Sequence, residues 1–334
     1  MGRATPAGLL RPARRVHAAA AGSSSGPEIL YVVTAGSHDC HNQAPPMTLM
    51  KLRHALPRLI LMACLAAPGA RAGNLTVTGS DTMVILGQKW AEVYMQQHPE
   101  ARIQVSGGGS GVGVAALQNN QTDIANSSRK IRNKEIEQCI KAFGRRPREY
   151  PVAMDGLSVY VNERNPVTRL SVQEIRDIYT GRITNWREVG GPDAKIILYS
   201  RENNSGTYEF FKEHVLLGRD FSPRAQTLAG TAQVLQSVAK DPNAIGYGGA
   251  AYGAGVRHLK VSAEKGGEAV EPTEETVTSM QYPIARFLYV YLNPALDQGE
   301  VKQYLDWIRS DAGQQVVKNV GYYPLPPELR HRGP

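Results

Sequence analysis

Short apolar and β-branched runs alternate with helical segments along the chain after residue 73. Strands are predicted at 75–77, 103–105, 123–125, 156–161, 196–199 and 285–292. Helices are predicted from about residue 83 to 97, over 115–120, from 171 to 180, from 207 to about 214, and as a pair within 300–320. Such alternation of strands and helices is typical of α/β architecture.

Start signals precede two of these helices. Asp81 or Thr82 is placed to cap the first helix, and Ser171-Val-Gln-Glu174 has the pattern of a capping box. The same part of the chain contains no internal repeat, no apolar run long enough to span a membrane and no Pro/Gly/Ser-rich linker. Any division into lobes is therefore expected to have strands that cross between them.

The charge of the chain is concentrated at its front. The 334 residues carry a formal charge of +8, but residues 1–72 hold eight Lys and Arg against two acids. Residues 73–334 therefore have a charge of only +2. This balance gives no electrostatic case for a nucleic-acid partner.

A targeting pattern explains this basic front. Lys51 to Arg58 form a basic stretch, 59–67 form a short apolar run, and Ala70-Arg71-Ala72 is an A-x-A cleavage signal. We interpret residues 47–72 as a signal peptide, with export to the periplasm. Residues 1–46 are interpreted as an extension from a start codon assigned too early, or as a disordered extension.

Cysteine usage leaves one alternative for this front segment. Leu61-Met62-Ala63-Cys64 is a loose lipobox, so a lipid anchor at Cys64 is a less favoured alternative to cleavage after Ala72. Only Cys139 follows the cleavage signal, which excludes an internal disulfide in the exported chain.

Small polar residues follow four of the predicted strands. These loops are Gly79–Met83, Gly107–Gly113, Asn126–Arg129 and Arg201–Thr207. Helix N-termini at the carboxyl ends of strands bind anions well, because their backbone N–H groups are unpaired. Ser and Thr add neutral donors, and Arg201 is a candidate for a charged, bidentate donor. Each loop alone fits an ordinary cap or turn, so this pattern indicates an anion-binding protein only when the four are taken together.

Enzyme signatures are weak by comparison. Gly111 to Ala116 fits a dinucleotide fingerprint and Glu135 lies at about the expected distance, but an exported chain meets little nicotinamide cofactor. Ser110 lacks the nucleophile-elbow pattern, because Val112 stands where Gly is needed. The histidines after residue 73 have no metal-ligand spacing. We therefore expect no enzyme activity, no cofactor and no metal.

The chain resembles the periplasmic phosphate-binding proteins of phosphate ABC transporters from about Asn74 to Pro326. The stretches that carry the resemblance, in chain order, are Gly79–Met83, Gly107–Gly113, Asp123–Arg129, Ile183–Trp186 with Gly190–Pro192, Asn204–Thr207, Ala244–Tyr247 and Val320–Pro324. The resemblance implies a two-lobed α/β fold of the type II periplasmic-binding-protein class, with a hinge between the lobes. Lobe I is expected to comprise residues 73–155 plus 284–334, and lobe II residues 156–283.

The resemblance also implies a phosphate site. Its residues are Thr82, the backbone N–H of Met83, Ser110, Ser128, Arg201, Ser205, Gly206 and Thr207.

Two positions depart from the family pattern. Better-known members have an Asp where this chain has Ser128, and that Asp accepts a hydrogen bond from the proton that phosphate carries and sulfate lacks. Our hypothesis for a substitute proton acceptor is Asp81, and a plain helix N-cap is the alternative for this residue. The second departure is Asn203, which replaces an Asp and removes a counter-charge from Arg201.

The function that the resemblance implies is capture of inorganic phosphate outside the inner membrane and its delivery to an ABC-type importer. The expected partners are phosphate and the membrane permease subunits, and the expected state is a monomer. Three alternatives remain open: a binding protein for sulfate, molybdate or tungstate, an exported phosphate-ester enzyme, and a surface adhesin or signalling protein with the same fold.

Overall fold

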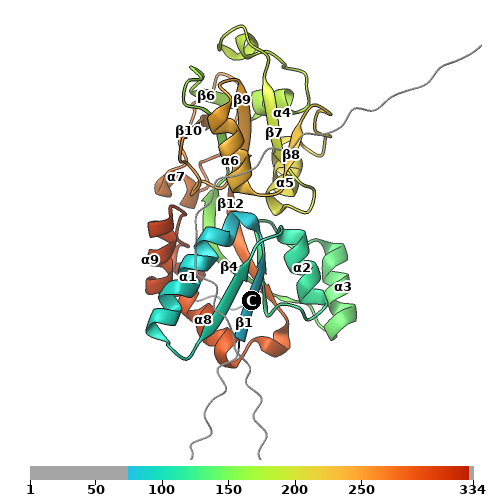
Figure 1. Cartoon of the computed structure of the whole chain (residues 1–334), viewed down its shortest axis with the longest axis vertical. Helices are drawn as coiled ribbons and strands as arrows, with labels where there is room; N and C mark the ends of the chain where they lie inside the picture. Colours follow the sequence, from blue (N-terminus) through green and yellow to red (C-terminus); the bar gives the residue numbers. More distant parts are fainter. Residues whose placement is uncertain (1–73, 331–334) are drawn as a thin grey trace, which may run out of the picture. The chain divides into compact units, whose positions relative to one another are not determined.

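The computed structural model describes residues 74–330, which belong to one compact unit of the chain (Figure 1). The predicted extension 1–46, the predicted signal peptide 47–72, Cys64 and His331 lie outside the described residues. No described helix is long and apolar enough to cross a membrane.

Two five-stranded sheets and a two-stranded sheet organise this unit. The first sheet has the order β2 (Arg102–Ser106), β1 (Asn74–Gly79), β3 (Ile124–Ser127), β12 (Ala285–Leu292) and β4 (Arg148–Gly156). The second sheet has the order β10 (Val256–His258), β5 (Ser158–Asn162), β9 (Ala244–Gly248), β7 (Ile197–Arg201) and β8 (Gln226–Leu228). The small sheet pairs β11 (Lys260–Ser262) with β6 (Arg169–Ser171). The predicted α/β class is confirmed.

Helices pack against each sheet. The helices near the first sheet are η1 (Asp81–Met83), α1 (Val84–Gln97), α2 (Ser110–Gln118), α3 (Asn133–Phe143), η4 (Pro294–Leu296), α8 (Gly299–Arg309), α9 (Asp311–Val320) and α10 (Pro327–Arg330). Those near the second are α4 (Val172–Tyr179), η2 (Trp186–Val189), α5 (Gly206–Phe210), the π-helical turn η3 (Phe211–Val215) and α6 (Thr231–Lys240). Helix α7 (Glu274–Thr278) lies against β4 and β12. In Figure 1, α1, α8 and α9 lie together on one side of the first sheet, and α2 and α3 lie on the other.

The chain passes between the two sheets through β4 and β12. These strands pair antiparallel over their whole lengths, and Leu157 alone separates β4 from β5. Two large apolar clusters lie around the sheets: one contains Trp90 and Leu86, and the other contains Trp186 and Phe211. The site loops are therefore anchored in two cores that the crossing strands join.

Most predicted elements are present, with informative differences. The helix that ends at Gln97, the capping box at Ser171, the strand Ala285–Leu292 and the last helix pair are confirmed. The predicted strand 156–161 is instead the end of β4, a one-residue link and β5. The first part of β4 was missed because Pro151 disfavours a strand interior, and the structure places Pro151 beside an irregularity in the β4–β12 register.

Other differences concern where two elements begin or end and how the first helix is capped. Helix α2 begins at Ser110, five residues before the predicted start, and β3 ends at Ser127 rather than at Ala125. The prediction that Asp81 or Thr82 caps the first helix was wrong. Ser80 precedes η1 and Met83 precedes α1, and neither cap position makes a side-chain hydrogen bond.

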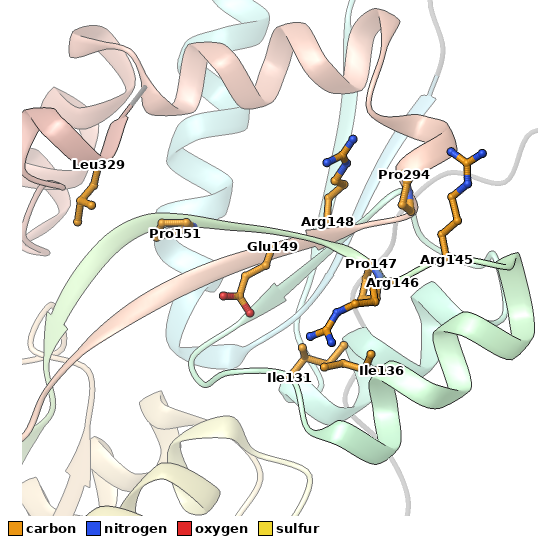
Figure 2. Close-up of a pocket in the computed structure, with 10 residues that line it drawn as sticks. All are labelled: Ile131, Ile136, Arg145, Arg146, Pro147, Arg148, Glu149, Pro151, Pro294 and Leu329. Carbon is orange, nitrogen blue, oxygen red and sulfur yellow. The ribbon is translucent and has the colours of Figure 1, made fainter. Parts of the chain in front are cut away.

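A surface pocket of about 690 Å³ lies beside the start of β4 (Figure 2). Its lining residues are Ile131, Ile136, Arg145, Arg146, Pro147, Arg148, Glu149, Pro151, Pro294 and Leu329. None of the predicted site residues lines it, so this basic pocket is separate from the loops that the sequence singles out.

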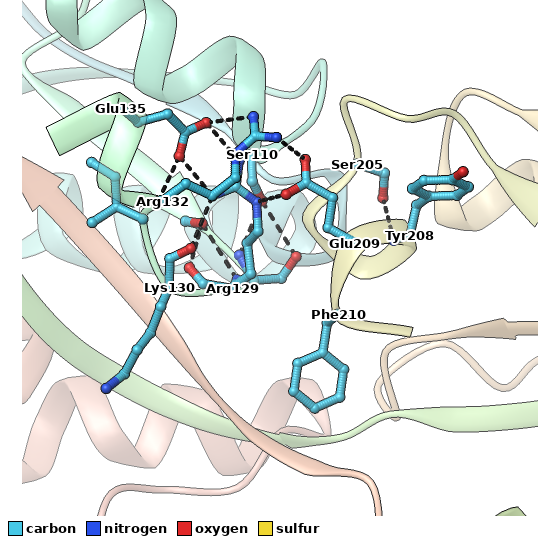
Figure 3. A network of polar contacts seen from close by, with 12 residues as sticks. Ser110, Arg129, Lys130, Arg132, Glu135, Ser205, Tyr208, Glu209 and Phe210 are labelled. Carbon is cyan, nitrogen blue, oxygen red and sulfur yellow. Dashed lines mark hydrogen bonds and ion pairs between the residues drawn. The ribbon is translucent and has the colours of Figure 1, made fainter. Parts of the chain in front are cut away.

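An ion-pair network links the loop after β3, helix α3 and helix α5 (Figure 3). Arg129 makes a bidentate pair with Glu135 at 2.8 Å, and its Nε lies 2.7 Å from Glu209. Arg132 lies 2.8 Å from Glu135 and 3.5 Å from Glu209. Burial raises the pKa of Glu135, but the hydrogen bonds from Arg129 and Arg132 outweigh it and lower the pKa to about 2. The ionised carboxylate therefore stabilises the fold, and it holds the two arginines that pair with Glu209 of α5.

We expect Glu135→Gln to lower the free energy of unfolding at pH 7 by about 2 kcal/mol. Because the pKa of Glu135 is depressed from 4.5 in the fold, its contribution is complete above that pH and is lost as the pH falls toward 2. Urea unfolding between pH 7 and 3.5 should therefore show a smaller loss of stability on acidification in the variant. Burial and the charge of Glu135 both raise the pKa of Glu209, so the comparison is made in a Glu209→Gln background, where Glu135 is the acid that differs.

The matched control is Glu137→Gln, an exposed position on the same helix. An equal stability and pH dependence for Glu135→Gln and this control would contradict the assigned role of the network.

Candidate functional site

Four hydroxyl-bearing side chains from separate loops meet in the interior of the unit. They are Thr82 in η1, Ser110 at the start of α2, Ser128 after β3 and Thr207 in α5. We call them the hydroxyl cluster. Each is at most 1% exposed, and they are joined through Thr207 and Ser128. The sequence-predicted loops of the first sheet therefore converge on one helix of the second sheet.

Short distances define the cluster. Thr82 Oγ1 lies 2.7 Å from Thr207 Oγ1, and Ser128 Oγ lies 3.4 Å from Thr207 Oγ1. Ser128 Oγ is also 3.4 Å from Ser110 Oγ, which accepts a hydrogen bond from the Ser128 N–H at 3.1 Å. A buried hydroxyl can donate one hydrogen and accept through two lone pairs. The cluster can therefore present several neutral donors to one small acceptor.

Local backbone geometry brings these loops together. Gly109 has a φ of 96°, and a Cβ there would lie 2.7 Å from the Asn204 carbonyl oxygen. A Cβ on Gly206 would lie 2.2 Å from Ser110 Oγ and 2.8 Å from Ser128 Oγ. The Gly111 N–H donates to the Asn204 carbonyl at 3.0 Å. Glycine at 109 and 206 is therefore what lets the two loops touch.

Three predicted residues occupy the same region without joining the cluster by a side chain. The Ser205 hydroxyl caps α5 by accepting from the Tyr208 N–H at 3.3 Å. The Met83 N–H donates to the Ser80 carbonyl at 2.9 Å, and the Met83 side chain is buried. The backbone of Gly206 lies close to the Ser110 and Ser128 hydroxyls.

Arg201 lies at the end of β7 and is 1% exposed. Its Nη2 donates to Asp81 Oδ2 at 2.7 Å, and its Nη1 donates to Thr231 Oγ1 at 2.9 Å. The Ala229 carbonyl accepts from Nε at 3.2 Å. Burial lowers the pKa of Arg201 from its ordinary value, against the opposing effect of Asp81, and an arginine remains charged at neutral pH. The guanidinium is therefore a fixed positive charge of this site.

Asp81 supplies the counter-charge to Arg201 that is lost where Asn203 replaces the Asp of the family pattern. Its Oδ2 accepts from Arg201, and its Oδ1 accepts from the Gly108 N–H at 2.8 Å. Asn203 itself is exposed. The carboxylate that balances Arg201 therefore comes from the loop after β1 and not from the loop after β7.

Tyrosine hydroxyls hold the η1 turn from behind. Tyr322 donates to the Thr82 carbonyl at 2.6 Å, and Tyr252 donates to the Asp81 carbonyl at 2.9 Å. Burial raises the pKa of Tyr252 to about 12 and raises that of Tyr322 well above its ordinary value. Both hydroxyls therefore remain protonated donors at neutral pH.

A buried ion pair beside the cluster was missed by sequence reasoning. Arg286 in β12 is 3% exposed and lies 2.8 Å from Asp155 in β4, which is fully buried. Its Nη2 also donates to Thr207 Oγ1 at 3.0 Å. The available signal was an arginine inside the predicted buried strand Ala285–Leu292, since an unpaired charge is not tolerated there.

Alternative chemistries find little support among residues 74–330. This part of the chain has no group of three or more His, Cys, Asp or Glu side chains that could hold a metal ion. Glu135, the acid of the weak dinucleotide pattern, is engaged by Arg129 and Arg132. Within the described residues, the Ser110 hydroxyl makes hydrogen bonds with Ser128, which is no general base. The arrangement suits binding better than catalysis.

Known proteins resemble this chain over most of its length. The family model of the PBP superfamily domain matches residues 66–312. A phosphate-binding protein PstS of Pseudomonas aeruginosa is 35% identical over 278 residues, which cover 78% of this chain and 86% of that protein. A phosphate-binding protein PstS of Staphylococcus aureus is 30% identical over 282 residues, covering 80% and 85%.

A solved structure from Clostridium perfringens is similar in fold, with a TM-score of 0.69 and 29% sequence identity. The match covers 76% of this chain and all of that one, which is described as a phosphate ABC transporter substrate-binding protein with bound phosphate. The predicted type II periplasmic-binding-protein fold is confirmed. The chain belongs to the PBP superfamily and, within it, to the family of the phosphate-binding proteins of ABC transporters.

Proposed function

We propose that this protein binds inorganic phosphate outside the cytoplasm and delivers it to an ABC-type importer, without catalysing a reaction. The observation that carries the proposal is the convergence of Thr82, Thr207, Ser128 and Ser110, whose hydroxyl oxygens lie 2.7 to 3.4 Å apart from one to the next, in a chain of this family. Hydroxyl groups at the starts of helices give a small oxyanion several donors from different directions.

The proposed binding set follows the sequence prediction. It comprises Thr82, the N–H of Met83, Ser110, Ser128, Arg201, Ser205, Gly206 and Thr207. Arg201 supplies the formal charge of this set, and Gly206 lets the backbone of α5 approach the anion. No nucleophile and base are required, because the bound anion leaves unchanged.

Asp81 has two proposed roles. Its contacts with Arg201 and Gly108 support a role as the counter-charge that positions the guanidinium. Its role as acceptor for the phosphate proton stays a prediction, and each carboxylate oxygen retains a lone pair for it.

Capture is proposed to use lobe closure. Lobe I would comprise residues 73–155 plus 284–334 and lobe II residues 156–283, with the hinge where β4 and β12 meet the second sheet. Contacts such as Thr82 with Thr207 and Asp81 with Arg201 join residues of the two proposed lobes. An anion held between them would favour the closed form because its donors come from both lobes.

The proposed cellular setting follows from the predicted signal peptide and from the family of the chain. The exported protein would act in the periplasm as a monomer, after removal of residues 47–72, and dock on the membrane permease. A lipid anchor at Cys64 remains the alternative form of export.

Calorimetric titration of the purified, anion-stripped protein should show one-to-one phosphate binding that excess sulfate does not displace. Tight phosphate binding follows from the donor set, and rejection of sulfate requires an acceptor for the phosphate proton. Equal heats with sulfate would leave the fold assignment intact and move the ligand to oxyanions in general, while molybdate and tungstate titrations would separate the remaining alternatives.

Arg201→Ala should weaken phosphate binding about ten- to a hundred-fold, because it removes a charge-assisted donor. Arg187→Ala, an exposed arginine paired with Asp193, is the control and should leave the affinity unchanged. An affinity for Arg201→Ala within threefold of the parent protein would exclude Arg201 from the site.

Gly206→Ala should also reduce phosphate affinity, by at least tenfold, since the added Cβ would clash with Ser110. Gly230→Ala is a matched control, because a Cβ there has no neighbour within 4 Å. Both variants are compared by titration and by thermal unfolding. If Gly206→Ala binds like the control, close approach of α5 is not needed for binding.

A further inference from the structure

Arg286 is held in one orientation by Asp155 on the paired strand. Its Nε and Nη2 donate to Asp155 Oδ2 at 3.0 and 2.8 Å. The guanidinium carbon also lies 5.2 Å from the centre of the Phe210 ring. A planar guanidinium with two donors on one carboxylate and an aromatic face beside it has little rotational freedom.

The remaining donors of Arg286 reach the hydroxyl cluster. Nη1 donates to the Ser128 carbonyl at 3.1 Å, and Nη2 donates to Thr207 Oγ1 at 3.0 Å. An ion pair with Asp155 alone would not require either contact. Arg286 is therefore placed between the two crossing strands and the cluster.

The contact with Thr207 fixes the direction of a hydrogen bond. Arginine has donors and no acceptor, so Thr207 Oγ1 must accept from Arg286 and cannot point its own hydrogen toward it. That hydrogen must point to the cluster, where Thr82 and Ser128 lie. An oxyanion in the cluster needs donors, and Thr207 is thereby held as one.

We propose that Arg286, oriented by Asp155, is a positioning residue of the anion site that holds the Thr207 hydroxyl as a donor to the bound anion. The proposal rests on the proposed function. It adds a second buried arginine to the site, and this arginine acts through Thr207. The Arg286–Asp155 pair then contributes to phosphate affinity as well as to the pairing of β4 with β12.

The test removes the pair without leaving a buried unpaired charge, by combining Arg286→Gln with Asp155→Asn. A glutamine amide can donate or accept, so the Thr207 hydrogen is no longer directed to the anion. Calorimetric titration with inorganic phosphate should show affinity weakened at least tenfold. Arg257→Gln, a half-buried arginine of the second sheet that donates to the Asn165 and Glu163 carbonyls, is the control and should bind as the parent does.

A double-mutant cycle separates positioning from a merely structural role. The same pair of substitutions in a Thr207→Val background should change phosphate affinity less than threefold, because no hydroxyl remains to be oriented. An affinity within threefold of the parent in the unmodified background, or an equal loss in both backgrounds, would overturn the proposal.

If circular dichroism shows that the paired variant does not fold, Arg286→Lys replaces it in the cycle. Lysine keeps a positive charge beside Asp155, but its single nitrogen replaces the three that contact Asp155, Ser128 and Thr207. We expect at least fivefold weaker phosphate binding, again dependent on Thr207, and binding within twofold of the parent would overturn the proposal. Absence of phosphate binding by the parent protein would instead contradict the proposed function itself.

Discussion

Burial of polar groups where α5 meets the loops of the first sheet is the constraint on which the site depends. Thr82, Ser110, Ser128 and Thr207 have almost no exposure, so each hydroxyl must find a partner within the protein or in a ligand. That requirement explains the two glycines that allow close approach and the tyrosines that hold the η1 turn. The same burial makes the site strong for an oxyanion, because in a low dielectric each donor interacts more strongly than it would in water.

Charge is balanced pair by pair around this cluster. Arg201 faces Asp81, and Arg286 faces Asp155, so each buried guanidinium has its own carboxylate. A buried charge without a partner would be strongly unfavourable, and this requirement explains why the pairs cross from one element to another. Arg201 and the neutral hydroxyls, one of them oriented by Arg286, can then serve a ligand without a large excess of positive charge.

The sequence predicted the loops of the site better than their contacts. Strand ends followed by small polar residues are visible in the chain, and the loops of Thr82 and Ser128 share one sheet edge because β1 and β3 are parallel neighbours. Thr207 comes from the second sheet, so its contacts with them do not follow from that topology. Partner choice was not visible: Asp81 was considered as a cap or a proton acceptor, whereas the structure pairs it with Arg201. The two residues are 120 positions apart, and no local pattern encodes such a contact. The missed β4 strand has the same origin, since β12, a distant segment, stabilises it despite Pro151.

Helix α5 shows how one short element can serve several contacts at once. Thr207 enters the hydroxyl cluster, Phe210 lies against Arg286, and Glu209 pairs with Arg129 and Arg132. Thr207 and Phe210 are three positions apart and so face the same side of the helix. A helix of five residues has little stability of its own, so its position must come from these contacts and from the π-helical turn that continues it. A change at one of the three contacts would therefore shift α5 and alter the other two contacts. This dependence couples the anion site to the ion-pair network and to the crossing strands.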